Sequence, residues 1–391
     1  MNAVEKMHHD FFAVKQVEFD YPSSVFVSNG EIFIADSGNH RVRKYLRNGQ
    51  TVTICGTDVQ GYNGDGIPAT EAQLCKPTSV FVSSSNQVYI SDDYGHRIRK
   101  IDQFGIISTI AGTGDCGYSA DYRDDVVATS AKLKYPYGLF VTDTEEVLFC
   151  DDKRVRKIDH LGMLRTIIGN GERDDTSILA KNASIYPNSI FVYKNEIYVA
   201  DYFHHQIKKV DKDGYISIVA GKEYIEEEYQ SETDDEIVVQ PVTTVPEVDG
   251  QPATLAEINP NYIFVHDDEI YFTEIGRVRK IDRNGIIRTI AGTGEDGFSG
   301  DGQLAIHAKV ACRALFVTEN SEVIIADDTR IRKIDQRSGI ISTIVGRARV
   351  GYKGDVAYDF KQFPHIGQKK KVIKPFPKAC YDISILIQHE Y

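Results

Sequence analysis

The sequence has no tryptophan and only three methionines in 391 residues, and its six cysteines are scattered without a C-x-x-C pair. Zinc fingers and RING domains need cysteines at short paired spacing, so these classes are excluded. No apolar run approaches the ~20 residues that a membrane-spanning helix requires. The first 19 residues, MNAVEKMHHDFFAVKQVEF, lack the apolar stretch of a secretory signal. We therefore expect a cytoplasmic protein with reduced thiols and no membrane partner.

Positive charge is in deficit, with 45 Lys and Arg against 57 Asp and Glu and a net charge of −12. The deficit is concentrated in residues 222–248, which hold nine acids and one lysine. We expect this segment to be a disordered acidic insertion, because it has too few large apolar residues to pack. A docking segment for a basic partner is the alternative. Affinity for nucleic acid rests on excess positive charge, so RNA binding is not favoured but stays open.

A glycine pattern typical of nucleotide-binding loops occurs in residues 289–303, TIAGTGEDGFSGDGQ, where Gly292, Gly294 and Gly297 spell G-x-G-x-x-G. A dinucleotide loop must open a helix whose N-terminus holds the pyrophosphate. The residues that follow carry two more glycines and no helical apolar period. The same spacing recurs in residues 109–117, TIAGTGDCG. The pattern therefore indicates an internal repeat rather than a nucleotide site, and we expect no cofactor.

The dipeptide Phe-Val marks six copies of one unit, at Phe26, Phe81, Phe140, Phe191, Phe264 and Phe316. Each copy continues with an apolar run ending in an acid, a basic alternating run and a run related to IISTIAG. In the fifth copy these runs are EIYFTE, GRVRKI and GIIRTIAG. Four short runs rich in Val, Ile, Tyr and Phe predict four strands per copy. The joins are too short for crossover helices, so the strands should be antiparallel.

Six four-stranded units predict an all-β fold, a six-bladed β-propeller over residues 21–347. A series of β-sandwiches is the competing fold, and the strict register of the copies disfavours it. Residues 1–20 form an N-terminal segment for which a ring-closing strand is one option. The role of the tail, residues 348–391, is open: it could close the ring, pair with the N-terminal run or begin a seventh blade.

The order F-V, I-A-D, N-H-R-V-R-K, D-x-x-G and T-I-A-G resembles the NHL repeat, and the T-I-A-G-T-G-x-x-G-F-S-G-D-G loops are similar to one branch of that family. The resemblance covers about residues 21–347. It implies a propeller that binds protein or RNA, with enzymes as a minority. The copies are unequal, because Asn39-His40 keeps the N-H pair while His96 and His205 keep only the histidine. A ligand that needs six equivalent blades is therefore not expected.

Each copy ends its second run with an acid and opens its third run with a basic or amide residue. The two positions flank one tight hairpin, so we expect them to bridge or to cap the turn rather than to bind metal. Four of these structural pairs are Asp36 with Arg41, Asp92 with Arg97, Asp151 with Arg154, and Asp327 with Arg330. The basic pair that follows, as in Arg279-Lys280, is expected to cover a blade flank and keep its charge in water.

The sequence offers no recognisable catalytic set. Lyase and lactonase propellers hold a metal at the starts of their innermost strands, which here read YPSSV, KPTSV, YPYGL, YPNSI, NPNYI and CRALF. Two amides, Asn188 and Asn261, do not hold a catalytic metal well. Asp65 and Asp301 in the long loops offer one carboxylate each, while calcium takes ~6–8 oxygens. We predict no catalytic residue and no metal, with a metal-dependent lyase or hydrolase kept as the alternative.

The prediction for function is a non-catalytic binding or scaffold module that recognises a protein partner on one propeller face. Long loops and the hairpins between second and third strands share one face in propellers, and rigidly held aromatic and histidine side chains suit partner recognition. The candidate partner-binding residues on this face are His40, Tyr94, His96, Tyr137, Asn188, Tyr202, His204 and Tyr262.

Overall fold

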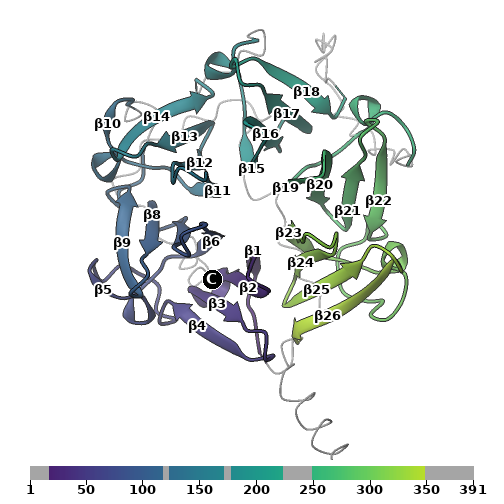
Figure 1. The fold of residues 1–391 in the computed structure, drawn as a ribbon, viewed down its shortest axis with the longest axis horizontal. Helices are drawn as coiled ribbons and strands as arrows, with labels where there is room; N and C mark the ends of the chain where they lie inside the picture. Colours follow the sequence, from purple (N-terminus) through teal and green to yellow (C-terminus); the bar gives the residue numbers. More distant parts are fainter. Residues whose placement is uncertain (1–16, 118–122, 171–177, 223–248, 348–391) are drawn as a thin grey trace, which may run out of the picture. The chain divides into compact units, whose positions relative to one another are not determined.

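The computed structural model describes residues 17–117, 123–170, 178–222 and 249–347. They form six β-sheets arranged as the blades of a ring (Figure 1), and each blade is built from four consecutive antiparallel strands. The predicted six-bladed β-propeller is confirmed. Residues 1–16, 223–248 and 348–391 lie outside the described residues, so the expectations for the N-terminus, the acidic insertion and the tail stay predictions.

The strands of each blade run in sequence order from the central axis outward. Blade one contains β1 (Pro22–Ser28), β2 (Glu31–Asp36), β3 (Arg41–Tyr45) and β4 (Thr51–Cys55). Blade two contains β6 (Pro77–Val82), β7 (Val88–Asp92), β8 (Arg97–Ile101) and β9 (Ile106–Ala111). Blade three contains β11 (Pro136–Val141), β12 (Val147–Asp151), β13 (Arg154–Ile158) and β14 (Met163–Ile168).

The second half of the ring follows the same plan. Blade four contains β15 (Pro187–Tyr193), β16 (Glu196–Asp201), β17 (Gln206–Val210) and β18 (Ile216–Ala220). Blade five contains β19 (Tyr262–His266), β20 (Glu269–Glu274), β21 (Arg277–Ile281) and β22 (Ile287–Ala291). Blade six contains β23 (Cys312–Val317), β24 (Val323–Asp327), β25 (Arg330–Asp335) and β26 (Ile340–Gly346).

The linkers between blades carry short elements that the sequence patterns did not predict. Two-residue strands pair with the outermost strands of blades two and three, β5 (Ile67–Pro68) with β9 and β10 (Val126–Val127) with β14. The linkers also contain single 3₁₀ turns, whereas η1 (Ser37–Asn39) lies in the β2–β3 hairpin of blade one. The linker turns are η2 (Ala69–Glu71), η4 (Ala128–Ser130), η5 (Ala180–Asn182), η6 (Ala253–Leu255) and η7 (Ala305–His307). Each of the last five begins with a buried alanine, which leaves room for the linker to lie against the blade.

The core consists of six clusters of buried apolar residues, and each cluster joins two neighbouring blades. At the axis the blades meet through the phenylalanine of each Phe-Val pair. Neighbouring ring centroids lie 4.4–5.2 Å apart, and the six contacts close into a circle of Phe26, Phe81, Phe140, Phe191, Phe264 and Phe316. Tilted and edge-on aromatic packing explains why every copy keeps this residue.

The ring closes between blades six and one through a cluster of buried residues, to which the segment before β1 contributes Phe19. Phe19 is fully buried against blade six residues such as Ile331 and Val345. It takes the place that the linker residue Leu74 takes between blades one and two. The described residues from 17 to 21 form no strand, so a ring-closing strand is not found in this part of the N-terminal segment. Arg347 adds a bridge to Glu18, at 2.7 Å between nitrogen and oxygen.

The glycine that ends each T-I-A-G run has a packing role. Gly292 has φ +96°, and a Cβ there would overlap the carbonyl oxygen of Gly276 at the hairpin of the same blade. Only glycine combines this left-handed φ with so close an approach of two backbones. Gly294 lies against the guanidinium of Arg277 in the same way. The G-x-G spacing therefore serves the junction between strands, and the segment that follows opens no α-helix in the described residues.

Candidate functional site

The candidate face lies where each innermost strand begins. In blade one, Asp36 pairs with Pro22 on one side and with Arg41 on the other. The start of β1, the end of β2 and the start of β3 therefore share one end of the sheet. We call this end the mouth face, formed by residues 20–24 and 36–41 of blade one and their equivalents. The hairpins at the other end of the blades form the far face.

All eight predicted partner-binding residues belong to mouth-face elements, but two of the histidines are used to join blades. His40 Nδ1 accepts a hydrogen bond from the backbone N–H of Lys76 at 3.2 Å, and His96 Nδ1 accepts one from Tyr135 at 3.4 Å. Burial lowers the pKa of His40 and of His96, which keeps both rings neutral and able to accept. These contacts give both histidines a structural role between neighbouring blades.

The hairpin tips differ in how far they reach into solvent. Tyr94 is 45% exposed, with the Lys76 ammonium 4.5 Å from its ring centroid and 3.3 Å from its hydroxyl. Tyr202 is half-buried, and burial raises the pKa of its hydroxyl. Large apolar side chains that the sequence analysis did not single out are also exposed at tips on this face, namely Phe203 and Ile275.

Blade four brings a histidine and a carboxylate together. His204 Nδ1 lies 2.8 Å from Asp201 Oδ2, and Lys208 Nζ lies 2.9 Å from the same oxygen. The hydrogen bond from His204 and the charge of Lys208 outweigh burial and lower the pKa of Asp201. This carboxylate is therefore held within an internal cluster.

The mouth of the central channel is ringed by the second residue of each innermost strand segment. We call this set the mouth ring, and it consists of Ser23, Thr78, Tyr137, Asn188, Asn261 and Arg313. Ser23 Oγ lies 3.0 Å from the carbonyl oxygen of Thr78, and Asn188 Nδ2 donates to Asn261 Oδ1 at 2.9 Å. Adjacent members thus come within hydrogen-bond reach of one another across blade boundaries. Only Tyr137 and Asn188 of this ring were among the predicted partner-binding residues.

Tyr262 lies deeper than predicted. Its side chain packs against the cores that blade six shares with blades five and one, and its hydroxyl hydrogen-bonds to Ser24 of blade one. The intervening residue of blade six is Ala314, whose small side chain leaves space for the ring. Tyr262 therefore crosses the channel interior, where it is less available to a partner than the hairpin tips.

The acid that ends each second strand clamps the linker that enters its own blade. Asp327 Oδ1 accepts the backbone N–H of Ala311, and Asp151 Oδ1 accepts that of Lys134 at 2.7 Å. The same bond is made in all six blades. The four acids Asp36, Asp92, Asp151 and Asp327 are fully buried, and burial raises the pKa of each to about 6.

The predicted acid–arginine pairs are displaced by one basic residue. In five blades the acid forms its ion pair with the second basic residue of the third strand, at 2.8–4.0 Å, as Asp327 does with Arg332 at 2.8 Å. The opening arginine instead binds a backbone carbonyl just after the T-I-A-G glycine, as Arg97 does with Thr113 at 2.8 Å. Both basic residues lie near the acid, but in these blades the second one shares the buried carboxylate.

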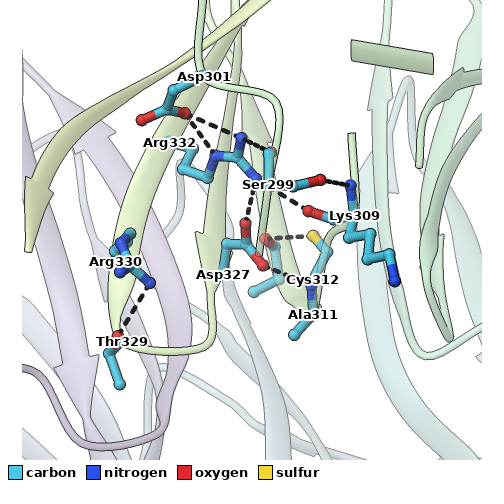
Figure 2. A network of polar contacts seen from close by, with 10 residues as sticks. Ser299, Asp301, Lys309, Ala311, Cys312, Asp327, Thr329, Arg330 and Arg332 are labelled. Atoms are coloured by element: carbon cyan, nitrogen blue, oxygen red, sulfur yellow. Dashed lines mark hydrogen bonds and ion pairs between the residues drawn. The ribbon is translucent and has the colours of Figure 1, made fainter. Parts of the chain in front are cut away.

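This second basic residue is buried, which corrects the expectation that its charge faces water. Arg99, Arg156, Arg279 and Arg332 are at most 1% exposed. Figure 2 shows Arg332 donating to Asp327, to Asp301 and to the carbonyls of Ser299 and Lys309. Asp301 is thus paired with arginine, as Asp65 is with Arg99 at 2.9 Å. These contacts give the loop aspartates a structural role in place of calcium.

The aromatic residues of the long loops stack on the opening arginines of the third strands. The Tyr62 ring centroid is 3.8 Å from the Arg97 guanidinium carbon, and that of Phe298 is 3.6 Å from Arg330. In five blades the lysine after the second basic residue pairs toward the far face with a glutamate at or just before the start of the second strand, as Lys333 does with Glu322 at 2.7 Å. The acidic and basic residues that recur in each copy are therefore paired with one another within the propeller.

One buried acid on the mouth face has no repeat-wide role. Asp93 is 2% exposed, and its Oδ1 has no hydrogen-bond partner. Burial raises its pKa to about 8, opposed by the charge of Lys76 and reinforced by that of Asp92. Burial raises the pKa of Tyr137 of the mouth ring, and the charge of the same Asp93 carboxyl raises it further. No sequence pattern singled out this position, because the residue type there varies from blade to blade. The equivalents of Asp93 are Ser37, Asp152, Tyr202, Ile275 and Asp328.

The mouth ring is poorly suited to a cation. Its members are neutral except for Arg313, whose positive charge would repel a metal ion. In the part of the protein that the structure describes, no three His, Cys, Asp or Glu side chains form a metal-binding group. Nor does any helix among these residues have the length and apolarity to cross a membrane.

Comparisons with known proteins agree with this architecture. Residues 19–45 match the model of the NHL repeat, and residues 49–123 match that of the teneurin NHL domain. Teneurin-m of Drosophila melanogaster is 25% identical over 309 residues, which cover 71% of this chain and 11% of that protein. Teneurin-4 of Homo sapiens is 24% identical over 349 residues, which cover 81% of this chain and 12% of that protein. The chain thus spans about a tenth of the length of these relatives.

Among solved structures, a protein of unknown function from Bacteroides thetaiotaomicron VPI-5482 superimposes with a TM-score of 0.54. The match is 16% identical and covers 81% of this chain and 70% of that one. At this identity the likeness concerns the fold alone.

Proposed function

We propose, from the premise that this chain is an NHL-repeat β-propeller, that it acts as a non-catalytic binding module for a protein partner. The observation that carries the proposal is the set of large side chains exposed at hairpin tips of three blades on the mouth face. Tyr94 of blade two is 45% exposed, Phe203 of blade four 41% and Ile275 of blade five 55%. Exposed aromatic and apolar residues on a rigid scaffold are typical of protein interfaces.

The alternatives are less well supported by the same residues. A metal-dependent lyase or hydrolase would need ligands where the mouth ring has hydroxyls, amides and a guanidinium. RNA binding would need free positive charge, but Arg99, Arg156, Arg279 and Arg332 are buried in the blades. A cytoplasmic location remains part of this proposal.

The experiment compares two triple variants of the full-length protein as bait in native extract. The mouth-face variant carries Tyr94→Ala, Phe203→Ala and Ile275→Ala. The control carries Phe104→Ala, Leu161→Ala and Tyr215→Ala, three exposed residues in hairpins between third and fourth strands, at the far end of the blades. Proteins retained by wild type and control but lost from the mouth-face variant support the proposal.

Identical capture by all three baits would refute the use of this face. Nuclease treatment tests the RNA-binding alternative, because captured proteins that nuclease releases from the bait are held through nucleic acid. Circular dichroism melts of the three baits establish that each is folded, since all six changes remove exposed side chains and leave the core intact.

A further inference from the structure

Arg313 is the charged member of an otherwise neutral mouth ring. Ser23 and Thr78 direct their hydroxyls to backbone carbonyls of the next blade, and Asn188 donates to Asn261. The Arg313 side chain, by contrast, makes no hydrogen bond or ion pair with any residue that the structure describes. Its Nε is buried and without a hydrogen-bond partner. The side chain is half-buried, and its buried Nε–H costs free energy unless an acceptor reaches it.

The guanidinium is nevertheless held in one orientation. Its central carbon lies 3.3 Å from the centroid of the Tyr21 ring, a stacked cation–π contact. Stacking uses the face of the guanidinium plane and leaves the donors at its edge available, which is the geometry in which arginine binds a planar oxyanion. A fixed, unpaired arginine is thus prepared to receive a ligand without losing much further side-chain entropy.

The next ring position supplies a second donor. Asn261 uses its Oδ1 to accept from Asn188, and its own Nδ2 group donates to no residue that the structure describes. The Asn188–Asn261 bond shows that neighbouring members of the ring reach one another across a blade boundary. Arg313 and Asn261 occupy such neighbouring positions, in blades six and five.

The negative charge around Arg313 makes a monoanion a better ligand than a dianion. Asp296 interacts electrostatically with Arg313 without contacting it, and the protein as a whole has a net charge of −12. One guanidinium cannot neutralise a phosphate dianion in this field, whereas it matches the single charge and the planar shape of a carboxylate. Nucleic acid, which presents many phosphates, is disfavoured for the same reason.

We propose that Arg313, together with Asn261 at the neighbouring position of the mouth ring, forms a carboxylate-binding subsite at the mouth of the central channel, and that the protein partner inserts a carboxylate there. This inference rests on the proposed function and adds the chemical group by which the partner is recognised. The carboxylate has two sources, the C-terminus of the partner or one of its aspartate or glutamate side chains. The subsite binds either by the same fork of hydrogen bonds.

The test follows the Arg313 Nε–H and Asn261 Nδ2 resonances of the isotope-labelled full-length protein by NMR, each assigned by its loss on substitution. The probes are N-acetylglycine for a C-terminus, N-acetylaspartic acid amide for a side chain, and neutral N-acetylglycine amide, titrated at constant ionic strength. We expect saturable shifts with one or both carboxylates and none with the neutral amide. Arg313→Gln should weaken binding about tenfold or more, read on the Asn261 resonance.

Arg47→Gln is the matched control, because Arg47 is an exposed arginine bound to Asn29 at a far-face hairpin. It should leave the titration unchanged. The proposal is overturned if neither carboxylate gives a saturable shift, if the neutral amide binds equally, or if Arg313→Gln binds as wild type. Binding of inorganic phosphate without binding of either carboxylate would also overturn it.

Failure of the subsite is distinguishable from failure of the proposed function. If the probes do not bind while the mouth-face triple variant still loses captured proteins, only the carboxylate inference is wrong. If the probes bind but capture is the same for all three baits, the subsite stands and the partner-binding role of the hairpin tips is wrong.

Discussion

Arg332 Nη1 lies 2.8 Å from Asp327 Oδ2, and neither side chain is exposed to solvent. The arginine also holds Asp301 and two loop carbonyls (Figure 2), so one ion pair ties the second and third strands of blade six to the preceding linker. Charges buried this deeply are stable only while paired, because desolvation of a lone ion is costly. Each blade of the ring is thus tied to the linker that enters it.

A double-mutant cycle should locate this coupling. Arg332→Ala leaves Asp327 buried without its ion pair, and Asp327→Ala leaves Arg332 with only the partly exposed Asp301 as counter-charge. Each change should cost about 3–5 kcal/mol of unfolding free energy. The double variant should cost clearly less than the sum. In the matched cycle, Asp327→Ala and Arg330→Ala should couple clearly less, because Arg330 faces Asp327 across the hairpin without sharing an ion pair with it. Urea unfolding of the variants measures both; equal coupling in the two cycles would contradict the assignment.

The sequence patterns were sufficient for the architecture and insufficient for this pairing. Six copies of four short apolar runs allow few folds other than a propeller, because each run is a strand and no join is long enough for a crossover helix. The acid and the opening basic residue do face one another across the hairpin, as Asp327 and Arg330 show. However, Arg330 and Arg332 are both basic residues of one strand, and only the path of the linker shows which one shares the buried carboxylate.

The candidate face was predicted less completely, for a related reason. Hairpin tips could be assigned to one face from strand order alone, so His40 and Tyr94 were correctly placed there. Whether a tip residue faces solvent or the next blade depends on contacts between repeats, which have no local sequence signal. His96 and Tyr262 therefore lie in blade junctions or in the channel, while the exposed Phe203 and Ile275 were missed.

Replacement of one glycine tests the packing explanation of the G-x-G spacing. Gly292→Ala forces a Cβ at φ +96° against the carbonyl of Gly276, so it should cost more than about 1 kcal/mol of unfolding free energy. Gly302→Ala is the matched control, because φ is +79° there but no atom lies near the added Cβ. It carries only the backbone strain and should cost less. Equal losses in chemical denaturation would show that the close approach is unimportant.

Removal of the acidic insertion should leave the propeller intact. The described residues on both sides are anchored, since Lys222 donates its backbone N–H to Ala256, and Asp249 binds Arg279 at 3.0 Å. Deletion of 224–246 keeps both anchors and removes most of the acidic charge of the segment. We expect a single cooperative melt close to that of the full-length protein by calorimetry. A broad or multi-step transition would indicate that the segment packs on the ring.

The buried carboxyl of Asp93 should make stability depend on pH. Its pKa is raised to about 8 by burial, whereas an exposed aspartate titrates near 3.8, so between these values the folded protein holds one more proton than the unfolded protein. The stability from this group is therefore complete below pH 3.8 and is lost as the pH rises through about 8. Asp93→Asn, which stays neutral, should remove this slope.

The measurement is the difference in unfolding free energy between wild type and Asp93→Asn from urea titrations at about pH 5, 6, 7 and 8. As the pH rises, we expect the unfolding free energy of wild type to fall relative to that of the variant by up to about 1.4 kcal/mol per pH unit. The neighbouring Asp92 is present in both proteins, so its own titration largely cancels in the difference.

Asp152→Asn is the matched control at the equivalent position of blade three, where the carboxylate already pairs with Lys134 at 3.1 Å. Its difference from wild type should be nearly independent of pH. Parallel curves for wild type and Asp93→Asn would mean that Asp93 is ionised in the folded protein, with Lys76 as its counter-charge.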